Sequence, residues 1–336
     1  MSEPASHGST VDVVGVGNAL VDVLSLATDE FLDDHELTKG AMALIDADQA
    51  DRLYAAMGPG TEMSGGSAAN TMVGVASLGG TSAFVGRIRD DTLGRVFAHD
   101  IRASGVRFDT AAASAGHPTG RCLILVTPDA ERTLNTFLGA ASELGVADVS
   151  ETLVRGAPVT YLEGYLFDQP DAKEAFRHAA KLAHAAGRRV ALSLSDTFCV
   201  ERHHADFLAL VEHGVDILFG NESEIRALYR VNRLDDAFEL VARHCELAAL
   251  TRGARGSVVV TPDGIHEVEV HPVAGPVVDT TGAGDQYAAG FLFAFTHGSD
   301  PVTCGRVGAM AASEVISHLG ARPERPLAEL AAPLLP

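Results

Sequence analysis

The sequence predicts an α/β protein with a doubly wound, mainly parallel sheet and helices on both of its faces. Short runs of β-branched and other apolar residues recur along the chain, and stretches with helical spacing separate them. Each run is nearly continuous in apolar residues, which is typical of parallel strands buried on both faces. Sheets of this kind bind ligands beyond the carboxyl ends of their strands, so the segments that follow the strands are expected to form the site.

The expected elements follow this alternation. Strands are predicted at residues 11–17, 159–162, 189–194, 215–219 and 247–250. A helix is predicted over residues 171–186, because Pro170 precedes it and Gly187 follows it. A second helix is predicted over residues 205–212, just ahead of Gly214.

Two segments, residues 19–46 and 109–140, do not show this alternation. In the second, residues 119–127 and 132–137 have the pattern of strands around a turn at 128–131. We interpret both segments as a small β-sheet lid that closes over the site and excludes water. The edge of its sheet either pairs with a second subunit, giving a homodimer, or stays unpaired. The remaining residues form a discontinuous α/β domain, at 11–18, 47–108 and 141–330.

The composition limits the classes of function. A formal net charge of −20 argues against nucleic acid or an anionic membrane as partner, because both attract basic surfaces. No apolar run approaches the roughly 18 residues that span a bilayer, and residues 1–10 lack the apolar core of a signal peptide. We therefore expect a cytoplasmic protein with a small-molecule substrate. The four cysteines are widely spaced, which indicates reduced thiols rather than disulfides or zinc ligands: Cys122, Cys199, Cys245 and Cys304.

The most informative segment places a small-residue turn and a carboxylate at the start of an apolar helix. Gly282, Ala283 and Gly284 leave backbone N–H groups free to approach an anion, and the positive end of the helix dipole favours phosphate there. Asp285 then lies beside the anion as a candidate base. The alternative is that Asp285 only complements the helix dipole. That alternative leaves the glycines unexplained, since each costs on the order of 1 kcal/mol in a helix.

Two further segments follow strands of the expected sheet. Asn221 and Glu224 form a capping-box pair, and Glu224 is also suited to hold a hydrated Mg²⁺ through water, so the two roles can coexist. The segment 251–256 follows the next strand and is expected to form one wall of a nucleotide site, in which an arginine contacts phosphate. Its candidate residues are Thr251, Arg252, Gly253, Arg255 and Gly256. Alone, the second pattern also fits an ordinary turn.

Gly65 and Gly66 open an alanine-rich helix that carries Asn70, and Asp22 lies just after the first strand. A carboxylate and an amide together can hydrogen-bond paired hydroxyl groups, as on a ribose. The simpler explanations are close helix packing for the glycines and an exposed strand position for Asp22.

Three other nucleotide or hydrolase motifs are not supported. The segment 15–20 begins like a dinucleotide-binding fingerprint but has Leu20 where glycine or alanine is needed. The segment 65–69 approximates a GxSxG nucleophile elbow but ends in alanine. No GxxxxGK[ST] segment is present, so phosphate binding does not use a Walker P-loop.

Together, these motifs resemble, in order and spacing, the motif set of the ribokinase-like (PfkB) carbohydrate kinases. The resemblance covers about residues 11–321 and is most specific at 279–285. It implies phosphoryl transfer from ATP, with Mg²⁺, to an alcohol. Asp285 would take the proton of the attacking hydroxyl, and the N–H groups of the turn would stabilise the moving phosphoryl group. The resemblance leaves open whether a monovalent cation lies beside this turn, as in some relatives.

Four stretches, at residues 17–22, 161–165, 192–195 and 215–222, are also similar to those of adenosine kinases. This resemblance implies a nucleoside acceptor. Two departures bear on selectivity, because Met42 replaces a glutamine that lies near the base in eukaryotic adenosine kinases, and Ser193 replaces an asparagine near the nucleotide. The residues implied to hold the ribose are Asp22, Gly66, Ser67 and Asn70, and those near the base are Leu138, Ala140 and Tyr165. The alternatives are a related ribose or ketohexose kinase and a non-catalytic nucleoside-binding protein.

Overall fold

The computed structural model describes residues 11–129 and 131–335. The expected N-terminal tail at residues 1–10 lies outside them, as does residue 130 of the expected turn. The larger of two sheets has eight strands. Six neighbouring strands are parallel, namely β11, β10, β9, β8, β1 and β5, whereas β12 and β13 add an antiparallel edge. The predicted, mainly parallel sheet is thus confirmed. Its spatial order is β13 (Gly264–Val268), β12 (Ser257–Thr261), β11 (Leu247–Thr251), β10 (Ile217–Asn221), β9 (Arg189–Ser193), β8 (Val159–Glu163), β1 (Val13–Val16) and β5 (Ser82–Val85).

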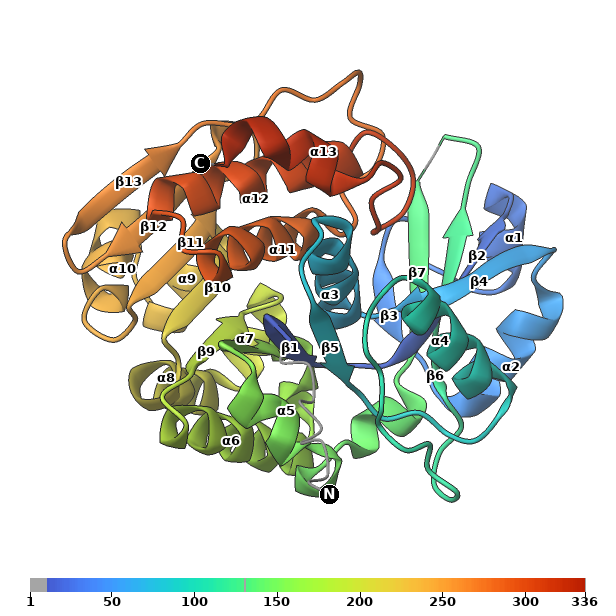
Figure 1. Cartoon of the computed structure of the whole chain (residues 1–336). Helices are drawn as coiled ribbons and strands as arrows, with labels where there is room; N and C mark the ends of the chain where they lie inside the picture. Colours follow the sequence, from blue (N-terminus) through green and yellow to red (C-terminus); the bar gives the residue numbers. More distant parts are fainter. Residues whose placement is uncertain (1–10, 130, 336) are drawn as a thin grey trace, which may run out of the picture.

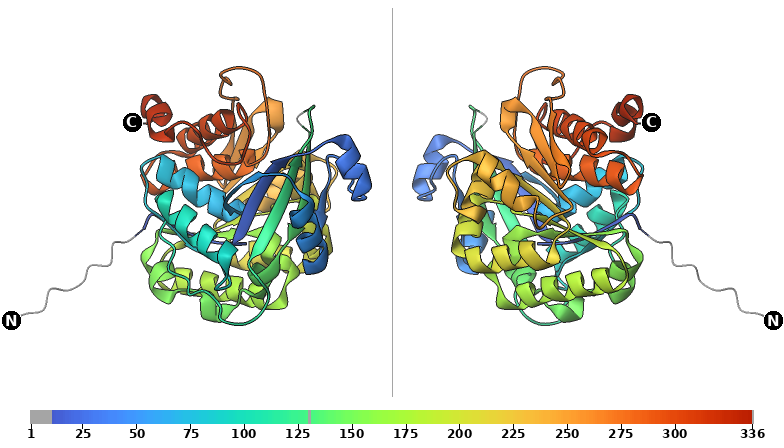
Figure 2. Two further views of the ribbon diagram at one scale, coloured as in Figure 1. Left: turned by 90° about the vertical axis from the view of Figure 1, so that its right-hand side faces the viewer. Right: turned by 90° about the vertical axis from the view of Figure 1, so that its left-hand side faces the viewer.

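Helices cover both faces of this sheet (Figure 1), and Figure 2 shows the same layers from the side. One face carries α3 (Ser67–Ser77), α11 (Ala283–Thr296), α12 (Pro301–Val315) and α13 (Leu327–Ala331). The other carries α5 (Glu151–Gly156), α6 (Pro170–Ala185), α7 (Thr197–Arg202), α8 (His204–Gly214), α9 (Glu222–Tyr229) and α10 (Leu234–Val241). Short 3₁₀ turns complete the chain at η1 (Gly139–Glu143), η2 (Val146–Asp148), η3 (Gly164–Asp168), η4 (Gly253–Arg255) and η5 (Ala332–Leu334).

The sequence signals explain the boundaries of α6. Pro170 occupies the first turn, where its missing N–H leaves no bond unmade. The buried face then repeats at helical spacing through Ala172, Ala175, Phe176 and Ala179. Gly187 follows with φ of 66°, a left-handed conformation that favours glycine and ends the helix.

The second sheet has the spatial order β3 (Met42–Leu44), β7 (Arg132–Phe137), β6 (Gly120–Val126), β2 (Leu20–Leu26) and β4 (Gly60–Gly65). It is accompanied by α1 (Asp29–Asp34), α2 (Ala47–Ala56) and α4 (Thr92–Ala103), visible beside it in Figure 1. Two expectations need correction. Residues 60–65, assigned above to the α/β domain, form β4 and pair antiparallel with β2. Residues 19–46 contain the helix α1 as well as strands.

The two sheets are joined where chain segments run close together. Gly66 has φ of 100°, and a Cβ there would lie 2.1 Å from the carbonyl oxygen of Asn18, so only glycine fits between β4 and α3. On the other connection, the Ala140 N–H donates to the Pro118 carbonyl at 2.8 Å. These two close backbone contacts hold the small sheet against the large domain. None of the helices in the described residues is long and apolar enough to cross a membrane.

Candidate active site

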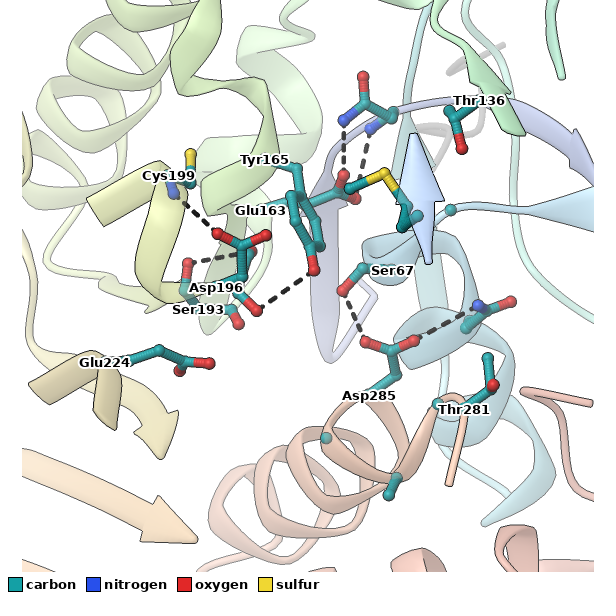
Figure 3. Close-up of a pocket in the computed structure, with 18 of the residues that line it drawn as sticks. Ser67, Thr136, Glu163, Tyr165, Ser193, Asp196, Cys199, Glu224, Thr281 and Asp285 are labelled. Carbon is teal, nitrogen blue, oxygen red and sulfur yellow. Dashed lines mark hydrogen bonds between the residues drawn. The ribbon is translucent and has the colours of Figure 1, made fainter. Parts of the chain in front are cut away.

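A cavity of about 830 Å³ lies between the small sheet and the carboxyl ends of the large sheet (Figure 3). Of the site residues predicted from the sequence, fifteen line it, and they come from both sheets and from three helix N-termini. They are Asp22, Met42, Gly66, Ser67, Asn70, Leu138, Tyr165, Ser193, Asn221, Glu224, Thr251, Gly282, Ala283, Gly284 and Asp285. Residues more than 200 positions apart in the sequence thus meet in one cavity, with the candidate base among them.

Asp285 lies in the first turn of α11 and faces the residues expected to hold an acceptor. Its Oδ1 accepts a hydrogen bond from Ser67 Oγ at 2.6 Å, and its Oδ2 accepts one from Asn70 Nδ2 at 3.4 Å. Burial raises the pKa of the Asp285 carboxyl to about 6, against the effect of those two hydrogen bonds. A carboxylate with this pKa is ionised at neutral pH and is still basic enough to accept a proton.

The turn ahead of α11 presents unbonded backbone donors to the cavity. Gly282 has φ of 76°, and a Cβ there would lie 2.6 Å from Cα of Ala321. The Ala283 N–H donates to the Thr280 carbonyl, and the Gln286 N–H donates to that of Gly282. The N–H groups of Gly282, Gly284 and Asp285 have no partner among the described residues. A Cβ at Gly284 would meet nothing within 4 Å, so this position opens directly into the cavity. The arrangement is suited to an anion.

Asp22 lies on β2 of the small sheet and lines the same cavity. Burial raises the pKa of its carboxyl to about 6, while the positive charges of Arg322 and Arg132 lower it and Asp285 raises it. Gly65 does not line the cavity but lies behind this carboxylate, since a Cβ at Gly65 would be 2.3 Å from Asp22 Oδ2. Gly65 and Gly66 therefore allow close backbone packing, and the absence of a side chain at Gly65 leaves room for the Asp22 carboxylate.

Asn221 and Glu224 form the predicted capping box at the start of α9. Asn221 Oδ1 accepts from the N–H groups of Ser223 and Glu224, and Glu224 Oε2 accepts from the Asn221 N–H at 2.9 Å. Burial raises the pKa of Glu224 to about 7. The carboxylate still lines the cavity, so capping leaves it available to a hydrated cation. Within residues 11–129 and 131–335, no three His, Cys, Asp or Glu side chains gather as a direct metal site.

The remaining predicted residues lie behind or beside the cavity. Ala140 is fully buried in η1. Arg252 points to β13, where Nη1 donates to Glu267 at 3.2 Å, and Arg255 pairs with Glu222. Gly253 and Gly256 shape the turn between β11 and β12, with φ of 59° and 79°. Of the segment 251–256, only Thr251 reaches the cavity, because the arginines are held by glutamates of this chain.

The sequence reasoning missed Glu163, which is 1% exposed at the end of β8. Its Oε1 accepts from Asn18 Nδ2 at 2.7 Å, and its Oε2 accepts from the N–H groups of Asn18 and Ala68. Burial raises the pKa of Glu163 to about 7, although these hydrogen bonds oppose the shift. An acid directly after an apolar strand was the available signal. Glu163 therefore joins Asn18, which lies between β1 and β2, to the first turn of α3. Because Ser67 is the first residue of that helix, this contact also positions Ser67.

Two other unpredicted groups adjoin the site. Asp196 caps α7, accepting from the Cys199 N–H at 2.7 Å, and lines the cavity near Tyr165 and Ser193 (Figure 3). Arg132 of β7 pairs with Asp279 of the turn ahead of α11, with 3.0 Å between Nη1 and Oδ2, and both side chains are buried. This ion pair links the small sheet to the turn of residues 279–285, called the anion turn below.

Comparison with known proteins agrees with the fold described above. The model of the pfkB family carbohydrate kinases matches residues 41–327. Among solved structures, adenosine kinase from Sinorhizobium meliloti is 50% identical, with a TM-score of 0.89 over 97% of this chain and 99% of that one. A probable sugar kinase from Rhizobium etli CFN 42 is 46% identical, with a TM-score of 0.89 over 97% of this chain and 100% of that one. Adenosine kinase 1 of Arabidopsis thaliana is 30% identical over 94% of this chain and 96% of its own length.

Proposed function

Because the chain belongs to the PfkB family of carbohydrate kinases and is therefore an ATP-dependent phosphotransferase, we propose that it phosphorylates the 5′-hydroxyl of a nucleoside, adenosine foremost. The observation that carries the proposal is the position of Asp285. It follows directly on the glycine turn and faces Ser67 in the same cavity that Asp22 lines. The apolar side chains of Met42, Leu134 and Leu138 line the same pocket and suit a nucleobase better than a free sugar.

The geometry supports the following chemistry. When bound, ATP would supply the γ-phosphoryl group, and its Mg²⁺ would offset the negative charge of the phosphate oxygens. Asp285 accepts the proton of the acceptor hydroxyl as that oxygen bonds to phosphorus, and the phosphorus–oxygen bond to ADP breaks. The free N–H groups of Gly282, Gly284 and Asp285 donate to the phosphoryl oxygens. We assign the nucleotide side to Ser193, Asn221, Glu224 and Thr251, with Glu224 holding the hydrated Mg²⁺.

The acceptor class is tested by measuring ADP release over adenosine, other nucleosides, ribose and ketohexoses. We expect turnover with nucleosides and kcat/KM highest for adenosine. Turnover with sugars alone would replace the proposal by the sugar-kinase alternative, which the similarity to the probable sugar kinase favours. Nucleoside binding without ADP release would indicate a binding protein.

Asp22→Ala tests the grip on the ribose. If the Asp22 carboxylate accepts hydrogen bonds from the 2′- and 3′-hydroxyls, its loss raises the KM for ribosides by about 10- to 100-fold, the worth of charged hydrogen bonds. A 2′,3′-dideoxynucleoside should be a poor substrate for the wild type and lose little more in the variant. Equal wild-type activity on both substrates contradicts the assignment.

The pH dependence follows from the two raised carboxyl pKa values. Both Asp285 and Asp22 have a pKa of about 6 and act as acceptors, so protonation of either removes function. We expect kcat/KM for the acceptor to fall as the pH drops below about 6, with a log–log slope that approaches two. At about pH 5 most of both carboxyls would be protonated. A kcat/KM that stays constant down to about pH 5 is therefore inconsistent with these roles.

We further propose a cytoplasmic role in purine salvage. The four cysteines are buried free thiols, which suits a reducing compartment. For assembly, we propose a homodimer through β3, an edge strand of the small sheet. Met42 and Leu44 of this strand are 51% and 52% exposed, which is unfavourable unless a partner or a closed lid covers them. Sedimentation of the free and nucleoside-bound protein separates these two outcomes.

A further inference from the structure

Arg322, which no sequence motif singled out, connects the anion turn to the small sheet. It lies between α12 and α13 with its side chain 14% exposed. Nη1 is 2.8 Å from Asp100 Oδ2 on α4, Nη2 is 2.6 Å from Ser64 Oγ on β4, and Nε is 3.3 Å from Asn70 Oδ1 on α3. All three nitrogens of the guanidinium therefore donate, each to a different element.

The residues just before Arg322 are bound to the phosphate side of the site. The Gly320 N–H donates to Asp279 Oδ2 at 2.9 Å, and the Ala321 carbonyl accepts from Gln286 Nε2 at 3.0 Å. This three-residue segment thus contacts the anion turn and α11 through its backbone. It contacts the small sheet and α4 through the Arg322 side chain.

The contact with Asn70 fixes the orientation of an amide in the site. Arginine can only donate, so the group of Asn70 that faces Arg322 must be Oδ1. Nδ2 is then turned toward Asp285, where it donates at 3.4 Å. Without Arg322, only the Asp285 carboxylate selects the orientation of this amide, because a flipped Asn70 would place two oxygens against each other.

Arg322 also contributes charge at Asp22. The charged or titratable groups around that carboxylate are Arg322, Arg132 of β7, Asp285 of α11 and Cys122, which is paired with Asp22 in the neighbouring strand β6. Arg322 ranks above Arg132 among the charges that lower the pKa of Asp22, which burial raises to about 6. Asp100 of α4 pairs with Arg322 and therefore offsets part of the positive charge that acts on Asp22.

We propose that Arg322 is a positioning residue for the acceptor: it holds Asn70 in the orientation that faces Asp285, and it fixes α3 against β4 and α4 on the acceptor side of the cavity. This proposal rests on the proposed function of the cavity, but not on the identity of the acceptor. It separates Arg322 from the phosphate-binding groups, because its contacts lie on the acceptor side of Asp285. A defect at Arg322 should therefore appear in acceptor binding and in pH dependence, whereas ATP binding stays nearly unchanged.

The test compares Arg322→Met and Arg322→Lys with wild type, using whichever nucleoside or sugar the wild type phosphorylates. In Arg322→Met we expect the acceptor KM to rise by about 10- to 100-fold, the KM for ATP to change by less than about threefold, and the acid limb of kcat/KM to move to higher pH, since a charge that lowers the pKa of Asp22 is removed. In Arg322→Lys the charge remains, so the acid limb should stay near its wild-type position. Its acceptor KM should still rise, because one ammonium cannot replace three fixed donors.

Arg325→Met is the matched control, since Arg325 is exposed three residues further on and, within the described part of the chain, hydrogen-bonds only through its backbone N–H, to Glu314. It should keep both KM values and the pH profile. Equal losses for ATP and acceptor with an unmoved acid limb in Arg322→Met would make Arg322 merely structural and overturn the proposal. If Arg322→Met does not fold, Arg322→Lys decides, and an unchanged acceptor KM there overturns it. Failure of the wild type on every acceptor instead rejects the proposed function.

Discussion

Asp285→Asn is expected to lower kcat by a factor of about 10² to 10⁴, the usual contribution of a positioned general base. Asparagine has nearly the same shape, and its oxygen can still accept the hydrogen bond from Ser67 Oγ. The amide is not basic, so the proton of the acceptor hydroxyl has no destination. Steady-state kinetics should show the loss in kcat, while the affinity for ATP, measured by calorimetry, stays within about threefold.

The folded state should not suffer from this change. The pKa of Asp285 is raised because burial disfavours its charged form, so above about pH 6 the ionised carboxylate opposes folding. A neutral amide removes that penalty, but its Nδ2 then faces Asn70 Nδ2, so the 3.4 Å hydrogen bond from Asn70 is lost. These two effects oppose each other, and we expect the Tm of the variant at neutral pH to stay close to that of wild type. This combination, a lower rate with no loss of stability, is typical of a group kept for function.

Asp300→Asn provides the control for the helix-dipole explanation. Asp300 caps α12 by accepting from the N–H groups of Val302 and Thr303, and it lies outside the cavity lining. If Asp285 only complemented the dipole of α11, the two variants would lose similar, small amounts of stability and neither would lose activity. A fully active Asp285→Asn protein would therefore remove the base assignment.

The contrast between Asp285 and Arg322 shows what this sequence can and cannot predict. The anion turn and the capping box are local, since each group lies within a few residues of its partner, and both were predicted from spacing alone. Arg322 acts on Asn70 across 252 positions, and Arg132 reaches from the small sheet to Asp279 in the turn ahead of α11. Nothing in the local pattern of either arginine distinguishes it from a surface cation. Only the fold brings each beside a carboxylate.

The strand β4 was misassigned for a related reason. Its sequence, GTEMSG, contains one β-branched residue and two glycines, so it lacks an intrinsic strand signal. It becomes a strand because β2 offers a free edge and because Gly60 and Gly65 fit closely against Leu24 and Asp22. Tertiary context thus decided the secondary structure. The long apolar strands of the large sheet needed no such help, and their prediction was confirmed.

Two glycine substitutions are expected to separate conformational need from ligand space in the anion turn. Gly282→Ala places a Cβ at φ of 76° and 2.6 Å from Ala321 Cα, so both strain and a clash result. We expect it to lower the stability by about 1–3 kcal/mol and to abolish most activity, since the turn must move. Thermal unfolding and kcat/KM should fall together in this variant.

Gly284→Ala should behave in the opposite way toward stability. Its Cβ meets no atom within 4 Å, and alanine favours a helix over glycine by about 1 kcal/mol, so the Tm should stay or rise. Gly284 also lines the cavity next to the unpaired N–H of Asp285, so we expect the added methyl group to narrow the space beside these donors. It should therefore keep an anion from these donors and lower kcat/KM by about 10- to 100-fold, somewhat less than the loss of a whole oxyanion donor. If Gly284→Ala were stable and fully active, phosphate would not approach this turn, whereas equal destabilisation of both variants would mean that Gly284 serves only the backbone.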